Sequence, residues 1–462
     1  MMIQFDAHHR WAAAIGVSLL SAAVAQGQVG LDPAVYSADA RGGITALGAA
    51  GKTAPRGARS RAWTDPVLLA SYPAFDNWNL DMAGARDSQD LLQFAVRLWQ
   101  YSDQNWNYDR YALDETGEIV GTWLNTPGLG KAAAFTDGAG HNVALRPVAT
   151  TQYFAAVDSN DYVHLASTLS GGSGWEVSYS KLDPNGNTLI SWDIITQDAD
   201  PWNFYVQPIV LNDDTVAVVW IRDTEDICAV KSTDHGVTWS DIIVLVDRTD
   251  TIQGSCVKAV VGSDDCLHLV WRTLDWSNYT EKLWYAKVYP DWSLCVDETI
   301  FFEGPCWYPY LSLDNANRLH VTFTPTYDVA TTLYYTRLRG DLDLGGNPAT
   351  DELLTLIGEE IVVSDVIPLH YPVNVPDAAG GVHVIYERGA YGCETDKDVY
   401  YISLPGPDCP ADFDGDGDVD TADLLILLAA WGTAGPDGDV DFDGDVDTAD
   451  LLALLAAWGP CP

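Results

Sequence analysis

The stretch Leu267-His268-Leu269-Val270-Trp271 has the apolar alternation of a half-buried β-strand, with a histidine near its centre. Related stretches recur along the chain, and in one copy an alanine replaces the histidine. They are Leu91-Leu92-Gln93-Phe94, Val163-His164-Leu165, Val216-Ala217-Val218, Leu319-His320-Val321 and Val382-His383-Val384. A period of about 50 residues with several short strands per unit is typical of β-propellers. The sequence therefore predicts an all-β propeller of six blades over residues 61–404.

Each unit has further parts in common. A tyrosine-rich strand follows the repeated strand and ends in a turn, and an outer strand such as 242–245 comes next. An aromatic residue followed by proline often opens the upstream strand, as in Tyr72-Pro73, Tyr308-Pro309 and Tyr371-Pro372. The repeated histidines are expected to be satisfied core residues, since a histidine on a half-buried strand is more often that than a ligand.

The sixth unit lacks an outer strand before Pro405, whereas residues 63–69 resemble the outer strand at 239–245. We therefore expect an N-terminal strand to close the ring. This closure would remove the open sheet edge that separate blades would leave.

The turn Ser232–Trp239 has the pattern S-x-D-x-G-x-T-W. In such a turn the aspartate accepts backbone amides, the glycine supplies a positive φ and the tryptophan packs beneath, so a structural role is expected. The pattern is the Asp box, and the chain from 61 to 404 resembles a six-bladed sialidase-like propeller. In that family an Arg-Ile-Pro motif opens the first blade. Here that place reads Ser71-Tyr72-Pro73, and Arg146-Pro147 precedes the second unit, so sialidase activity is not expected.

The resemblance places a functional mouth at the loops that follow each second strand and precede each first strand, opposite the Asp-box face. Aromatic and charged residues gather there and suit a carbohydrate, because rings stack on sugar C–H surfaces while charged groups bind hydroxyls. The candidate ligand-binding residues are Arg222, Asp223, Arg272, Asp275, Trp276, Tyr308, Tyr371, Glu387, Arg388 and Tyr391, and Trp202 lies in one of the same loops. Ordinary polar loops are the alternative, and catalytic residues are not identified.

Two further stretches, Asp412–Asp423 and Asp439–Asp450, are copies of one twelve-residue loop, 27 residues apart. Each offers oxygen at positions 1, 3, 5, 7, 9 and 12 and a glycine at position 6, which is the EF-hand arrangement for calcium. The expected ligands are Asp412, Asp414, Asp416, Asp418 and Asp423 in the first loop and Asp439, Asp441, Asp443, Asp445 and Asp450 in the second. Asp420 and Asp447 would act through a water. Two calcium ions are therefore predicted.

Nearly the same leucine-rich helix follows each loop, and the two helices are expected to pack on each other. Residues 408–462 closely resemble a type I dockerin. The resemblance implies a cohesin-like partner, contacted by positions 10 and 11 of each loop. These are Thr421, Ala422, Thr448 and Ala449. The alternative, an acidic tail of low complexity, would show neither regular spacing nor apolar helices.

The formal net charge of −42 argues against nucleic acid or an anionic membrane as a partner, since both require a basic surface. Residues 1–25 read as a secretory signal peptide, with a buried N-terminal helix as the alternative. Eight cysteines in an exported chain favour disulfides. Cys409 with Cys461 would clamp the last module, and Cys256 with Cys266 and Cys295 with Cys306 are candidate bridges whose connectivity the sequence leaves open.

The domain organisation predicted is a signal peptide (1–25), a flexible segment (26–60), the propeller (61–404), a linker (405–407) and the dockerin-like module (408–462). The predicted function is that of a secreted, carbohydrate-active or glycan-processing protein tethered to an extracellular complex. A glycoside hydrolase is one form of it. A noncatalytic propeller that binds glycan or protein and is displayed through the same module is the alternative.

Overall fold

The computed structural model describes residues 63–460 apart from short gaps. The gaps are 73–80, 100–105, 130–131, 148–153, 172–173, 197–201, 224–225, 248–256, 264, 276–279, 305, 315–318, 325–331, 339–366, 368, 379–380, 390–395, 405–408, 414–417, 434–437 and 441–444. The expected signal peptide, flexible segment and linker therefore lie outside the described residues.

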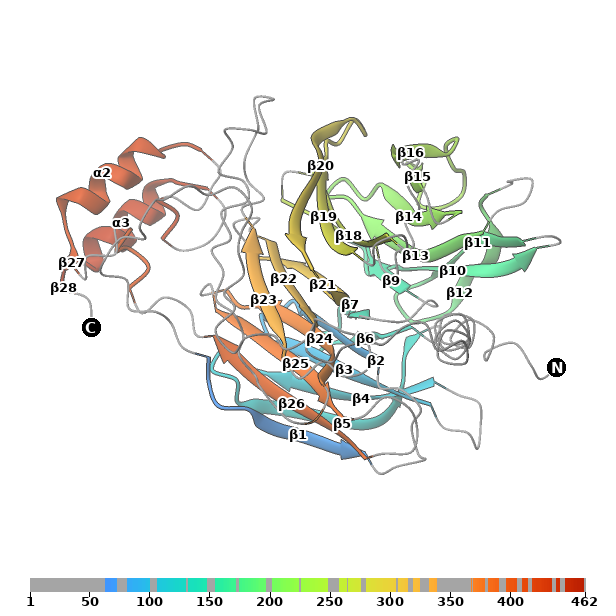
Figure 1. Cartoon of the computed structure of the whole chain (residues 1–462), viewed down its shortest axis with the longest axis horizontal. Helices are drawn as coiled ribbons and strands as arrows, with labels where there is room; N and C mark the ends of the chain where they lie inside the picture. The colour runs from blue at the N-terminus through green and yellow to red at the C-terminus, as the bar shows by residue number, and fades with distance from the viewer. Residues whose placement is uncertain are drawn as a thin grey trace, which may run out of the picture. The chain divides into compact units, whose positions relative to one another are not determined.

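Six antiparallel sheets make up most of the described chain, and we call them blades 1 to 6 (Figure 1). Blade 1 holds β2 (Asp81–Arg86), β3 (Leu92–Trp99), β4 (Trp106–Leu113) and β5 (Ile119–Pro127), with β8 (Arg146–Pro147) added beside β2. Blade 2 holds β9 (Phe154–Val157), β10 (Val163–Gly171), β11 (Gly174–Leu182) and β12 (Thr188–Ile194). Blade 3 holds β13 (Asn203–Val210), β14 (Val216–Arg222), β15 (Asp226–Ser232) and β16 (Ile243–Val246).

The remaining blades follow the same order. Blade 4 holds β17 (Lys258–Val261), β18 (Leu267–Asp275), β19 (Thr280–Val288) and β20 (Leu294–Glu303). Blade 5 holds β21 (Trp307–Leu313), β22 (Leu319–Thr324) and β23 (Tyr334–Leu338). Blade 6 holds β24 (Leu369–Pro376), β25 (Val382–Arg388) and β26 (Lys397–Leu404), with β1 (Val67–Tyr72) as its outermost strand.

The first strands of the blades form a closed inner ring. β9 contacts β13, β13 contacts β17, β17 contacts β21, β21 contacts β24 and β24 contacts β2. Between β2 and β9 the ring passes through β8 and through a small hairpin of β6 (Ala134–Thr136) and β7 (Asn142–Ala144). The prediction of a six-bladed propeller is confirmed. The hairpin and β8 belong to no repeat unit and were not predicted.

The repeated histidines lie in the second strands β10, β18, β22 and β25 and are buried. In each of these blades Nδ1 of the histidine lies 2.6 to 2.8 Å from a tyrosine hydroxyl of the third strand. In blades 2, 5 and 6, Nε2 also lies 2.9 to 3.1 Å from the carboxylate of an aspartate six residues earlier. The histidines are therefore core residues, and they link the three inner strands of a blade through side chains.

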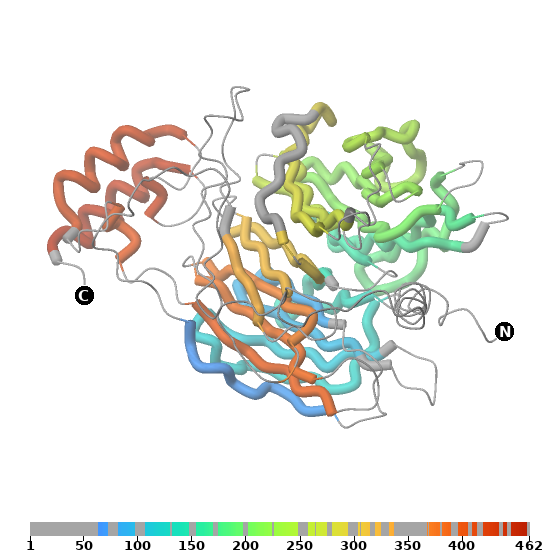
Figure 2. Tube along the Cα trace, in the orientation of Figure 1, coloured from blue at the N-terminus to red at the C-terminus, as the bar shows by residue number. Residues whose placement is uncertain are grey.

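The two ends of the propeller chain lie in one sheet. β1 pairs antiparallel with β26, and Val67 stands opposite Tyr401 (Figure 2, blue beside orange). Just before β1, the backbone N–H of Thr64 donates to the carbonyl of Ser403 at 2.8 Å. Tyr72 lies in this closing strand and not, as expected, at the start of a first strand. The reason is that blade 1 takes its first strand later, at β2.

The two candidate bridges, Cys256 with Cys266 and Cys295 with Cys306, are not formed. Cys266 and Cys306 are buried and take part in no disulfide, and the same is true of Cys228. Each occupies a tightly packed site at or near a strand, where a thiol is accommodated as a small apolar side chain. Cys256 and Cys461 lie outside the described residues, so the pairing of Cys409 with Cys461 stays a prediction.

Near the C-terminus, within the described residues, stand two short helices, α2 (Thr421–Ala429) and α3 (Thr448–Ala456). They contact each other, and Leu427 and Leu454 share a small core with Val419, Val446, Val440 and Ala411. Two-residue strands, β27 (Asp418–Val419) and β28 (Gly459–Pro460), pair with each other. We call residues 409–460 the helical module. None of the helices that the structure describes has the length and apolar character needed to cross a membrane.

Candidate functional site

The arginines predicted to line the mouth lie at or near the ends of second strands, and carboxylates engage them. Arg222 Nη2 lies 2.5 Å from Asp226 Oδ2 across the turn between β14 and β15. Arg388 Nη1 lies 3.6 Å from Asp398 Oδ2, the carboxylate of the residue opposite it on β26. Both arginine side chains are about a quarter exposed. They therefore combine an internal partner with access to solvent.

Arg272 is in a different environment. Its side chain is 2% exposed, and its guanidinium lies 3.6 Å from the ring centre of Trp307. Nε donates to Glu281 Oε2 at 3.2 Å, while Nη2 lies 3.1 Å from Oε1. The same Oε2 accepts the backbone N–H of Cys306 at 2.8 Å. Arg272 thus joins blade 4 to the first strand of blade 5, and its role as a ligand contact stays a prediction.

A second buried ion pair lies in blade 6. Lys397 Nζ donates to Glu387 Oε1 at 3.0 Å, and both side chains are 1% exposed. Removing one partner of such a buried pair strongly destabilises the fold, because the other charge is then left unpaired in a low-dielectric environment. Glu387 is thereby held in a structural contact rather than presented to solvent.

The predicted tyrosines meet in the core. Tyr308 and Tyr371 have ring centres 4.3 Å apart and hydroxyls 3.4 Å apart, and both are buried. Both adopt a positive φ, near 51° and 52°. Each lies at an irregularity in the pairing of its strand with the next one, β21 with β22 for Tyr308 and β24 with β25 for Tyr371. Tyr205 has the same conformation at the matching place in β13. Because a positive φ is strained for a bulky residue, this repeated bulge is held in place by packing.

One exposed aromatic platform does lie among the predicted mouth loops. Trp202 is 49% exposed, and its backbone is fixed by Asp223. The N–H of Trp202 donates to Asp223 Oδ1 at 3.0 Å, and the N–H of Asp223 donates to the carbonyl of Trp202 at 2.8 Å. Asp275 ends β18 opposite Thr280. Trp276 and Tyr391 lie outside the described residues.

The Asp box is a turn at the opposite end of the blades. Asp234 Oδ1 accepts the N–H groups of Val237 and Thr238, and Oδ2 accepts the hydroxyl of Thr238. These hydrogen bonds lower the pKa of Asp234 from 3.8 to about 2, and the bond from the Thr238 hydroxyl contributes most. Trp239 packs edge-on against Tyr179 of blade 2, with ring centres 4.9 Å apart. The turn is structural, as expected.

Each of the two predicted calcium loops leads into a helix through the same capping contacts. Asp420 and Asp447 are the N-caps, and Asp423 and Asp450 complete a capping box. Asp423 Oδ2 accepts the N–H of Asp420 at 2.8 Å, while Oδ1 accepts the N–H of Phe413 at 2.7 Å. In the same way, Asp450 Oδ2 accepts the N–H of Asp447 at 2.7 Å and Oδ1 accepts the N–H of Val440 at 2.6 Å. The carboxylate at position 12 therefore ties both halves of its loop together.

The second loop brings carboxylates close to one another. Ligand atoms of Asp445, Asp447 and Asp450 lie within 4.8 Å of one another. Oxygen donors in such a cluster suit a hard cation such as calcium. Expected ligands Asp414, Asp416, Asp441 and Asp443 lie outside the described residues. Of the others, Asp439 is buried, Asp412 is half-buried and Asp418 lies in β27.

The predicted partner-binding residues Thr421, Ala422, Thr448 and Ala449 are all exposed, at the start of α2 and α3. On each helix an exposed apolar row continues from them. The row is Leu425, Leu428 and Trp431 after the first loop and Leu452, Leu455 and Trp458 after the second. The duplicated sequence therefore presents the same exposed side chains twice.

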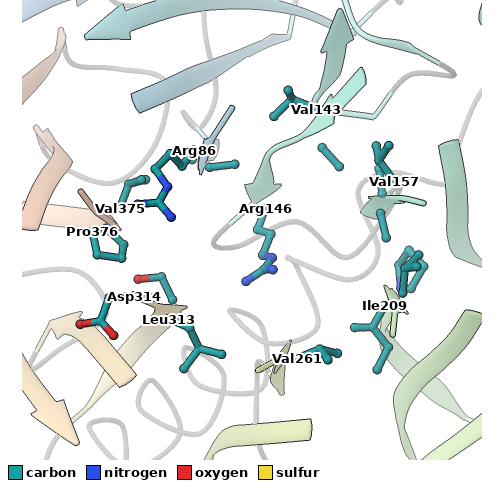
Figure 3. A pocket seen from close by; sticks show the side chains of 18 of the residues that line it. Arg86, Val143, Arg146, Val157, Ile209, Val261, Leu313, Asp314, Val375 and Pro376 are labelled. Carbon is teal, nitrogen blue, oxygen red and sulfur yellow. The ribbon is translucent and has the colours of Figure 1, made fainter. Parts of the chain in front are cut away.

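A cavity of about 650 Å³ lies inside the inner ring (Figure 3). Residues from the first strands of all six blades and from β7 and β8 line it. Arg86 and Arg146 point into it. Across it, the hydroxyl of Tyr310 donates to the carbonyls of Gly84 and Arg146 at 2.9 and 3.1 Å. No site was predicted here from the sequence, although Arg146 was noted. The signal that could have revealed it is Arg86, which stands at a place where the other units carry apolar residues.

No protein-family model matches the sequence, and a search of curated proteins also finds no match. Solved structures match over most of the propeller. A Dyadobacter fermentans protein of unknown function is 11% identical, with a TM-score of 0.45, covering 73% of this chain and 99% of its own. A Penicillium chrysogenum α-L-arabinanase is 13% identical, with a TM-score of 0.44 and coverage of 74% and 99%. A Fusarium graminearum α-L-arabinofuranosidase is 8% identical, with a TM-score of 0.44 and coverage of 72% and 97%. At these values the likeness assigns no activity to this chain.

Proposed function

We propose that this chain is a secreted glycan-processing protein that a calcium-dependent, dockerin-like module attaches to a cohesin-like partner. The observation that supports the proposal best is the duplication within the helical module. Two nearly identical acidic loops start two helices through the same capping box, and the helices share one core. A chance acidic tail has no reason to repeat this set of contacts.

Calcium would reduce the repulsion between carboxylates that each loop brings together. We expect the full chain to bind two calcium ions. Asp412→Ala should remove one of them, and Asp412→Ala combined with Asp439→Ala should remove both. Titration calorimetry gives the stoichiometry directly. Asp437→Ala, which changes an acidic residue outside both loops, is the matched control and should still bind two.

Chelation should also expose the helices. Limited proteolysis of the full chain, read by mass spectrometry, should show new cleavage within residues 421–458 in excess chelator and none in the propeller core. A cleavage pattern that is the same with calcium and with chelator would contradict the metal-dependent module. A stoichiometry that ignores the substitutions would contradict the assignment of the loops.

For the propeller, Trp202 is the described residue that best fits a carbohydrate, because it exposes an aromatic face at the mouth end on a backbone fixed by Asp223. One observation favours the noncatalytic alternative. Four described carboxylates at this end, Asp226, Glu281, Glu387 and Asp398, bind cationic side chains of the protein. A carboxylate held in this way is a poor acid or base. Asp223 instead accepts the backbone N–H of Trp202.

A panel of polysaccharides, assayed for both retention and cleavage, decides between the two candidates. We expect Trp202→Ala to weaken retention by about 0.5–1.5 kcal/mol, the usual value of one aromatic stacking contact, with little change in melting temperature. Val237→Ala, an exposed apolar residue on the Asp-box turn, should have no effect. Retention without cleavage would support the binding propeller. Equal retention by the Trp202 variant would exclude this loop as the site.

A further inference from the structure

One arginine of the cavity stands where the other blades carry an apolar residue. In each of five blades a tight turn follows the first strand, and a backbone N–H closes it by donating to the carbonyl four residues later. The donors are residues 87, 158, 211, 262 and 377. The residue just before this turn lines the cavity in every blade. It is Val157, Val210, Val261, Leu313 or Pro376 in blades 2 to 6, but Arg86 in blade 1. Five apolar side chains and one guanidinium therefore face the same space.

The second arginine comes from outside the repeat. Arg146 stands opposite Gly84 in the pairing of β8 with β2. Cross-strand partners, and residues two apart on a strand, point to the same face of a sheet, so Arg146 and Arg86 project from the same face. Figure 3 shows both guanidiniums reaching into the cavity from that side. Two like charges at diagonal positions, roughly 7–8 Å apart at their backbones, repel each other unless something stands between them.

Arg86 has an exposed counter-ion, since its Nε lies 3.6 Å from Asp90 Oδ1. Arg146, in contrast, lacks an internal counter-ion among the residues that the structure describes. Its carbonyl accepts from Tyr310, but no described group pairs with its guanidinium. Asp314, the acidic residue of the lining, is occupied elsewhere, since its Oδ2 lies 3.1 Å from Nε2 of His320. Burial lowers the pKa of Arg146 below its ordinary value, and the nearby Tyr310 partly opposes this. The positive charge of Arg146 therefore faces the cavity without a described counter-ion.

We propose that this cavity binds a small oxyanion, a carboxylate, sulfate or phosphate group, held by Arg146 and Arg86. A planar guanidinium donates two parallel hydrogen bonds to such a group, which is the geometry that these anions prefer. The volume exceeds that of one inorganic anion and falls in the range of small-molecule sites. The anionic group is therefore either a free ion or the acidic end of a sugar whose ring contacts the surrounding aliphatic side chains.

This site is separate from the mouth. The turns after the first strands and the Asp-box turn lie at the same end of an antiparallel blade, whereas Arg222, Trp202 and Arg388 lie at the other end. The calcium loops and the mouth take no part in this anion site. The proposal can therefore fail while the proposed function stands, and the reverse also holds.

Titration calorimetry on the full chain tests the site with four probes at constant ionic strength: sodium sulfate, sodium phosphate, sodium glucuronate and neutral glucose. We expect saturable binding of at least one anion and none of glucose. Arg146→Gln should weaken that binding at least tenfold. Arg97→Gln, which changes an arginine near the end of β3 and so toward the opposite end of blade 1, should bind the anions as the unaltered chain does. Tighter binding of glucuronate identifies a sugar acid as the ligand, and tighter binding of sulfate or phosphate identifies a free ion.

Two further variants keep the test decisive. Arg146→Lys retains the charge but loses the paired donors, so its affinity should fall between those of the unaltered chain and Arg146→Gln. If Arg146→Gln does not fold, as judged by its melting curve, Arg86→Gln should show the same loss of anion binding. The proposal is overturned if the unaltered chain binds none of the anions, or if folded Arg146→Gln binds them as tightly.

Discussion

Buried histidine residues set the chemistry of the blade cores. His164 lies between the hydroxyl of Tyr179 at 2.6 Å and the carboxylate of Asp158 at 3.1 Å, and is fully buried. Burial lowers the pKa of His164, although Asp158 opposes this. Burial also raises the pKa of Tyr179, and the hydrogen bond from His164 contributes to the lowered pKa of Asp158. The network therefore favours a neutral imidazole beside an ionised carboxylate.

This arrangement makes part of the stability depend on pH. Below pH 6.5, the ordinary pKa of histidine, the unfolded chain takes up a proton at His164 that the folded chain resists, so stability falls as the pH falls. His164→Gln removes this linkage. We expect it to cost about 1–3 kcal/mol at pH 7, through lost buried hydrogen bonds, and progressively less toward pH 5. Urea denaturation at pH 7, 6 and 5 measures the difference.

The control is His235→Asn, because His235 is exposed on the Asp-box turn at φ 59°, a conformation that asparagine tolerates. It should change the free energy of unfolding by less than about 0.5 kcal/mol at pH 7. A cost of His164→Gln that stays constant from pH 7 to pH 5 would show that the imidazole is not held neutral.

At the scale of single elements, β1 completes the sheet that it joins. It covers β26, whose other edge already pairs with β25, and Leu69 and Tyr72 pack into a core that reaches blades 1 and 5. Side chains strengthen the pairing, since the Ser71 hydroxyl donates to Asp398 at 2.6 Å. Without β1, the backbone groups along one side of β26 would lack partners and form an edge suited to pairing with other chains.

A chain that begins at Pro73 should therefore melt several degrees lower than one that begins at Arg61, or should aggregate on heating. Differential scanning calorimetry gives the melting temperature, and light scattering reports aggregation. The chain that begins at Arg61 keeps β1 and is the control. If both chains melt at the same temperature without aggregation, β26 does not need its outer neighbour.

At the scale of the whole molecule, the sequence predicted the architecture better than the site. Strand alternation and turn chemistry are local, so the second strands around residues 93, 164, 217, 268, 320 and 383 were all found. The tertiary partners are not local. The contacts of Arg272 with Glu281 and Trp307, which lie 9 and 35 residues farther along the chain, could not be predicted from the sequence around it. β8 was missed because a two-residue strand has no period of its own.

The pairing of β1 with β26 also has a consequence for how the protein is made. Thr64 and Ser403, which bond to each other, are 339 residues apart in the chain. At roughly 5–20 residues per second, a ribosome needs about 17–70 s to reach the second after the first. For that time β1 has no partner strand, and Leu69 and Tyr72, which pack into the core of the folded chain, remain available to other chains. A chaperone that shields an extended apolar segment would be needed most at the earliest stage of synthesis. It could dissociate once β26, in the last blade, has been synthesised.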